Sequence, residues 1–176
     1  MKNLTLFLVC MIAAVVFNSC HSGEVKENKP AAAVLNPNDS LFMVNEGGYQ
    51  FQIILPKDMM IASTPSIKMN EATGDLHIQC GEQFWIVATL EKTDIPAIKT
   101  AIGEDMLFTS KIVEETNNSI LYQRMLPDGA LYDYNFRSVQ EIAGKSYSFR
   151  TSEEGEFSME SVNRMKQAIG SIQQSV

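Results

Sequence analysis

The side chains best suited to chemistry in this sequence are a histidine and a cysteine that lie close together. His77 and Cys80 are three positions apart in a run whose apolar residues alternate as in a β-strand. Residues an odd number of positions apart on a strand point to opposite faces of the sheet. We therefore expect His77 to face outward, Cys80 to act as a small buried hydrophobic residue, and the two not to form a catalytic dyad.

Two other kinds of site are incomplete in the sequence. A zinc site needs three or four ligands at workable spacing, and His77 is the one histidine expected in the folded part of the chain. Gly144, Lys145 and Ser146 resemble the end of a phosphate-binding loop, but Val139 stands where such a loop needs another glycine. We therefore predict neither a metal nor a cofactor.

Acidic residues are plentiful, yet pairs such as Glu114 and Glu115 lie beside expected turns, where solvated carboxylates are the usual state. The spacing nominates no pair of carboxyl groups for glycoside hydrolysis. A hydrolase that uses Asp133 or Glu141 is the least favoured of three functional hypotheses, and we predict that the protein is not an enzyme.

The stretch from Asn118 to Ser152 organises the rest of the chain and predicts three consecutive antiparallel strands. Turns at 127–129 and 143–145 separate the strands, because glycine adopts the positive φ angles that such turns need. Alternation places aromatic side chains on one expected inner face: Tyr122, Tyr132, Tyr134, Phe136, Tyr147 and Phe149. Most of this face should lie beneath a helix. Part of it, drawn from the first five of these residues, is a possible surface for a ligand or a partner.

The remaining elements predict a single α+β domain over residues 41–176. Further strands are expected at 41–44, 49–55, 67–69, 76–80, 84–90 and 108–115. Residues 57–65 are left unassigned, because Met59, Met60 and Ile61 are apolar while Pro65 and the small residues favour a loop. A mid-chain helix should follow Thr93 or Asp94, and a C-terminal amphipathic helix should follow Ser158 as its N-cap. The sum is an antiparallel meander of about eight or nine strands on which the C-terminal helix packs.

The first residues are typical of an export signal. Lys2 precedes an apolar run from Leu4 to Phe17, which is shorter than the roughly 20 residues of a membrane span but suits a secretory signal. The run ends at Ser19 and Cys20, and this ending resembles the lipobox of bacterial lipoprotein precursors, although Phe17 and Asn18 depart from the usual residues there. The resemblance implies a signal peptide over 1–19 and lipid attachment at Cys20.

The residues after Cys20 predict where the domain is held. Residues 21–40 are polar, contain two prolines and show no periodic pattern, so 20–40 should be a lipidated cysteine and a flexible tether. Because histidine and not aspartate comes directly after Cys20, the resemblance implies the outer membrane, facing the periplasm. Several acyl chains hold a protein stably in a bilayer.

A second, looser resemblance concerns the folded part. Residues 49–56 (YQFQIILP) resemble the opening strand and Leu-Pro motif of the PsbP-like fold. Proteins of that fold are mostly non-enzymatic binding or assembly proteins, which is what the resemblance implies here.

Net charge restricts the partners. Removing residues 1–19 takes away Lys2 and no acid, which changes the formal net charge from −7 to −8. Such a chain, without clustered Lys and Arg, is unsuited to nucleic acid. The favoured hypothesis is a non-enzymatic, lipid-anchored cell-envelope protein that binds or supports an envelope protein. The alternative is a periplasmic binder of a small ligand that uses the aromatic sheet face.

Overall fold

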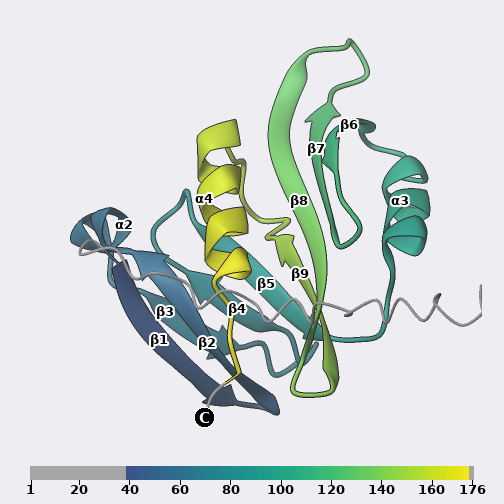
Figure 1. Ribbon diagram of the computed structural model, residues 1–176. Coiled ribbons are helices and arrows are strands. Elements are labelled where there is room, and N and C mark those ends of the chain that lie inside the picture. Colours follow the sequence, from purple (N-terminus) through teal and green to yellow (C-terminus); the bar gives the residue numbers. More distant parts are fainter. Residues whose placement is uncertain (1–38, 175–176) are drawn as a thin grey trace, which may run out of the picture. The chain divides into compact units, whose positions relative to one another are not determined.

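The computed structural model describes residues 39–174, which belong to one compact unit, Ala33–Val176. The expected signal segment, Cys20 and nearly all of the expected tether lie outside the described residues. Within residues 39–174 the protein is α+β, with nine strands in two antiparallel sheets and three helices (Figure 1).

The larger sheet has seven strands in the order β3-β4-β5-β9-β8-β7-β6. Two meanders, β3–β4–β5 and β6–β7–β8–β9, meet where β5 pairs with β9. The three consecutive strands expected between Asn118 and Ser152 are confirmed as β7, β8 and β9. The strands are β3 (Ser66–Met69), β4 (Leu76–Gln79), β5 (Trp85–Leu90), β6 (Thr109–Glu115), β7 (Ser119–Met125), β8 (Leu131–Ile142) and β9 (Lys145–Thr151).

The first two strands form a separate sheet, which corrects the expectation of one continuous meander. β1 (Asp39–Glu46) pairs only with β2 (Tyr49–Pro56) among the described strands. The inner face of β2 packs on the larger sheet, where the ring of Phe51 lies edge-on to Tyr147 at 5.7 Å between centroids. The hairpin therefore covers part of the sheet instead of extending it.

A short helix, α2 (Lys57–Ala62), occupies the start of the segment after β2 that the sequence left unassigned. Met59 and Met60 are partly buried against the main core. We attribute the helix to this tertiary packing, because intrinsic helix propensity is a weak determinant that packing often overrides.

The two predicted helices begin at the expected caps. Asp94 caps α3 (Ile95–Gly103) by accepting a hydrogen bond from the Ala97 amide at 2.8 Å. Ser158 caps α4 (Met159–Gly170) by accepting one from the Ser161 amide at 3.1 Å. Both side chains satisfy amides that a helix start leaves without partners.

The two helices cover opposite faces of the larger sheet. Leu121 of β7 joins the main core with the buried side chains of α4, whereas its neighbours Ile120 and Tyr122 pack with the isoleucines of α3 in a second cluster. Alternate residues of a strand point to opposite faces, so β7 is buried on both. No helix among the described residues is long and apolar enough to span a membrane.

Candidate functional site

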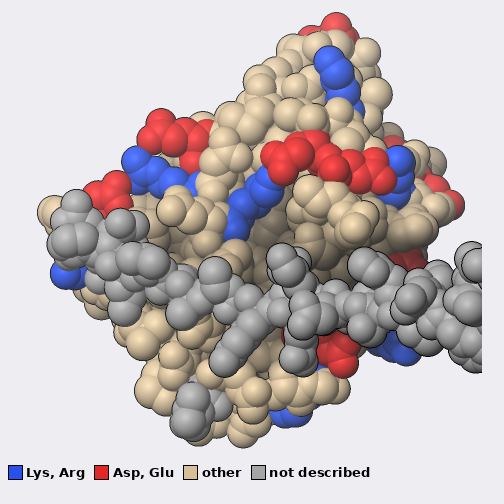
Figure 2. All heavy atoms as spheres, viewed as in Figure 1, with Lys and Arg blue, Asp and Glu red and all other residues tan. Residues whose placement is uncertain are grey.

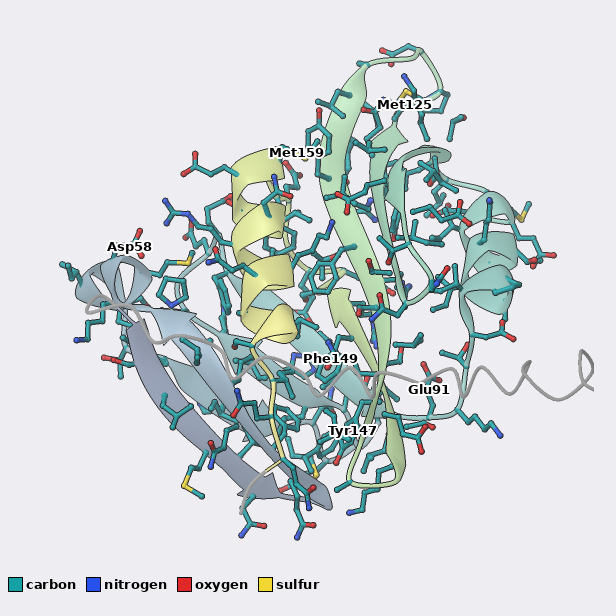
Figure 3. The ribbon with its side chains drawn as sticks, in the orientation of Figure 1. Asp58, Glu91, Met125, Tyr147, Phe149 and Met159 are labelled. Carbon is teal, nitrogen blue, oxygen red and sulfur yellow. The ribbon has the colours of Figure 1, made fainter. Side chains whose placement is uncertain are left out.

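The structure separates the six aromatic residues that were predicted to share one face. Phe136 and Tyr147 lie in the main core, and Figure 3 shows Tyr147 and Phe149 on β9 beside the β1–β2 hairpin. Tyr134 packs at the edge of the same core. Tyr122 lies beneath α3 on the opposite face. The prediction of one shared face is therefore wrong for Tyr122, because β7 carries apolar residues on both of its faces.

Tyr132 is displaced from its expected face by a β-bulge. Arg124 of β7 pairs with Asp133, but the next residue, Met125, pairs with Leu131. Tyr132 is thus the extra residue of β8, and a bulge of this kind re-aims a side chain and bends the strand. Tyr132 consequently lies beside Arg124 instead of beside Tyr134.

Arg124 is held between a carboxylate and two aromatic rings. Its Nε donates to Asp133 Oδ1 at 2.8 Å, and its second terminal nitrogen donates to the other carboxylate oxygen. The guanidinium carbon lies 4.6 Å from the ring centroid of Phe108 and 5.4 Å from that of Tyr132. The two rings are themselves stacked, with centroids 4.8 Å apart. A bidentate arginine with cation–π contacts makes this a rigid platform.

The platform continues inward through a buried polar network. Asn135 donates to Asp133 Oδ1 at 2.8 Å, and the Thr151 hydroxyl donates to Asn135. These contacts join β7, β8 and β9, and Asp133 and Asn135 are both buried. A network whose members are all satisfied fixes the side chains that it connects.

Large apolar side chains are exposed in the loop before β6 and at the end of the β7–β8 hairpin. Met106 is 98 % exposed, Leu107 is 75 % exposed and Leu131 is 51 % exposed. The cross-strand neighbours Thr109, Met125 and Leu131 bring the loop before β6 next to the hairpin turn. We call this the hairpin-end surface, and it consists of Met106, Leu107, Phe108, Leu126, Leu131 and Tyr132.

Acidic groups border the hairpin-end surface. Asp105 accepts hydrogen bonds from the amides of Leu107 and Phe108, at 2.8 and 3.1 Å, and so orders the loop. The Tyr132 hydroxyl donates to Glu156 at 2.8 Å, and this bond raises the pKa of Tyr132. Asp128 accepts from the Ala130 amide within the turn. In Figure 2 the projecting end of the hairpin is mostly tan, with an acidic group at its tip.

The residues considered for chemistry are engaged in structural contacts. His77 Nδ1 accepts a hydrogen bond from the Trp85 indole at 3.0 Å. Cys80 is buried, its thiol donates to the Ser63 carbonyl, and burial raises its pKa. Asp133 is paired with Arg124, whereas Glu141 is exposed near the other end of β8. No cluster of three or more potential metal ligands occurs in residues 39–174.

A cavity of about 240 Å³ lies between α3 and the larger sheet. Its sheet side carries three hydrogen-bonding side chains, Ser110, Tyr122 and Arg137, and its helix side is formed by Ile98, Ile102 and two alanines. Glu91, which Figure 3 labels before α3, and Asp105 after it complete the rim.

Sequence reasoning did not nominate Arg124, Leu107 or Leu131 for the site. A signal was present, because Leu126 and Leu131 flank the Pro-Asp-Gly turn where polar residues are usual. The loop at 104–108 gave a second signal, since three apolar residues, 106–108, come after Asp105 at a helix end.

Comparison of this chain with models of protein families, with curated proteins and with solved structures finds no match.

Proposed function

We propose that this chain is a non-enzymatic, lipid-anchored cell-envelope protein that docks an envelope protein partner through the hairpin-end surface. The observation that carries the proposal is the exposure of large apolar side chains around a platform that Arg124 holds rigid. Exposed apolar patches of this kind, rimmed by polar groups, are typical of interaction sites. A preordered platform reduces the entropy that is lost on binding.

The acidic rim favours a protein partner over the bilayer surface. Asp105, Asp128 and Glu156 lie around the apolar residues, and the expected mature chain has a net charge of −8. Negative charge repels anionic lipid, whereas basic side chains on a protein can complement it. We therefore propose a partner with an apolar patch and flanking Lys or Arg, reached from the outer membrane by a domain tethered at Cys20.

The proposal of a lipid anchor is based on the sequence that precedes the described residues. The apolar run before Cys20 and its resemblance to a lipobox support lipid attachment. Holding the domain at the membrane confines its search to partners in the same envelope compartment, which raises the effective concentration of each. The likeness of residues 49–56 to the PsbP-like fold, which is the second resemblance, stays a prediction.

Site-specific photo-crosslinking in intact cells tests the docking. A photoreactive phenylalanine analogue at Leu107 should capture one envelope protein as a discrete adduct, because the side chain lies in the proposed contact. The same analogue at Gln167, an exposed position on α4, is the matched control and should give no such adduct. The Cys20→Ala variant with the analogue at Leu107 should lose most of the adduct. Equal capture from both positions, or no protein adduct from Leu107, would overturn the docking proposal.

The alternative of a ligand held on the aromatic face has less support. Phe136 and Tyr147 are buried in the main core, so their rings offer almost no accessible surface for a ligand. Tyr122 lines the cavity of about 240 Å³ under α3, whereas Phe136 and Tyr147 border smaller pockets of about 110 and 200 Å³.

A further inference from the structure

We infer that the cavity under α3 is a binding site for a small monocarboxylate with an apolar body of about the size of a benzene ring. This site goes beyond the proposed docking function and requires neither the lipid nor the partner. It is built from α3 and from strands β6, β7 and β8.

The volume suits a ligand of this size. The cavity measures about 240 Å³. An apolar cavity of about 150 Å³ is large enough to bind benzene. The remaining space accommodates one carboxylate, whereas a bulky multi-ring compound would not fit without movement of α3.

The sheet side of the cavity offers three hydrogen-bond donors, and one of them has no partner within the described residues. Ser110 Oγ is buried and has no hydrogen-bond partner within residues 39–174. Tyr122 is buried, and this burial raises its pKa, so its hydroxyl keeps its proton at neutral pH. Arg137 interacts with the Tyr122 hydroxyl, and its contact with the exposed carboxylate of Glu153 is loose, at 3.8 Å between nitrogen and oxygen.

This donor set matches a carboxylate. A guanidinium presents parallel N–H groups that bind both oxygens of a carboxylate, and hydrogen bonds to a charged group are stronger than neutral ones. The hydroxyls of Ser110 and Tyr122 can donate to the same anion, since a hydroxyl donor rotates to suit its acceptor. Binding would also give the buried Ser110 hydroxyl the partner that it lacks, which removes a cost of the empty site.

The helix side sets the rest of the selectivity. Ile98 and Ile102 are buried residues of α3, and they give the ligand's body an apolar wall. Glu91 and Asp105 line the same cavity and carry negative charge. A second carboxylate on the ligand would meet these acids, so the site should reject dicarboxylates.

Titration of the isotopically labelled chain, purified as the cell processes it, tests this site by NMR. Benzoate is the probe, benzamide is its neutral counterpart of the same shape, and terephthalate adds a second carboxylate. Benzoate should shift the amide resonances of Ile98, Ser110 and Tyr122 saturably. Benzamide and terephthalate should each bind at least about tenfold more weakly, as expected for the loss of a charge-assisted contact or the gain of a repulsive one.

Two variants locate the site. Arg137→Gln should weaken benzoate binding by about tenfold or more, whereas Lys99→Gln, which removes an exposed cation from the same helix region, should leave it unchanged. Ala101→Leu should fill the cavity and abolish binding without altering any charge. The inference is overturned if benzoate gives no saturable shift at these residues, if benzamide binds as well as benzoate to the unmodified chain, or if Arg137→Gln and Ala101→Leu both bind normally.

Discussion

Replacing Arg124 by alanine is expected to destabilise the domain by about 3 to 5 kcal/mol, the usual cost of leaving a buried charge without its partner. The Asp133 side chain is only 1 % exposed, and Arg124 supplies both of its charged hydrogen bonds. Within residues 39–174, the carboxylate would then retain only the hydrogen bond from the Asn135 amide. Denaturant unfolding of the variant and the parent chain gives the difference in the free energy of unfolding.

A double variant separates the contribution of the ion pair to stability from that of side-chain packing. Arg124→Met combined with Asp133→Leu removes both charges, and such replacements are often neutral or stabilising. We therefore expect the double variant to be more stable than Arg124→Ala. Lys99→Ala is the control, because its pair with Glu115 is exposed and should contribute no more than about 1 kcal/mol. An Arg124→Ala variant no less stable than this control would show that Asp133 is not dependent on Arg124.

The second large effect is expected at Phe51, where alanine should cost about 3 to 5 kcal/mol of unfolding free energy. Phe51 is fully buried, and its ring lies edge-on to Tyr147 and Phe149, at 5.7 and 5.9 Å between centroids. The loss removes apolar contact between the two sheets and leaves a cavity. Thermal or denaturant unfolding of the variant and the parent chain measures this loss of stability.

Met43→Ala is the matched control for Phe51→Ala. Met43 lies on the other strand of the same hairpin and is largely exposed, so its truncation should change stability by at most about 0.5 kcal/mol. If Phe51→Ala were as mild as this control, the β1–β2 hairpin would not be packed on the larger sheet as described.

Local sequence patterns predicted the parts of the fold that depend on local physics. The meander of β7, β8 and β9 results from alternation and from two turns with glycine, and Gly129 and Gly144 do adopt positive φ angles of 85° and 74°. The cap residues Asp94 and Ser158 were also identifiable, because a side chain that accepts from a nearby amide needs no distant partner.

The division into two sheets was not predictable in the same way. β2 pairs with β1 and packs on β9, and the partner of a strand depends on contacts far along the chain. Alternation places residues on faces without saying which sheet a strand joins. The helix α2 could not be assigned from the sequence for the same reason, because its methionines gain their contacts from the assembled core.

The position of Tyr132 was predicted wrongly because a β-bulge interrupts the alternation of side chains between the two faces of the strand. Alternation assigned Tyr132 to the face of Tyr134. In the structure Tyr132 is the extra residue of the bulge, and it lies beside Arg124. Asp133 was considered only as a carboxylate of the least favoured hypothesis, a hydrolase, whereas it is a buried partner of Arg124. A bulge of this kind depends on strand pairing and not on any residue type alone.

Metabolic labelling with a radioactive fatty acid tests most directly whether the domain is held at a membrane and works there by contact. The account predicts that the mature chain incorporates the label, that Cys80→Ala incorporates it equally, and that Cys20→Ala does not. Cys80 is the matched control because it is a buried thiol within the domain. An unlabelled mature chain, or labelling that persists in Cys20→Ala, would contradict the account.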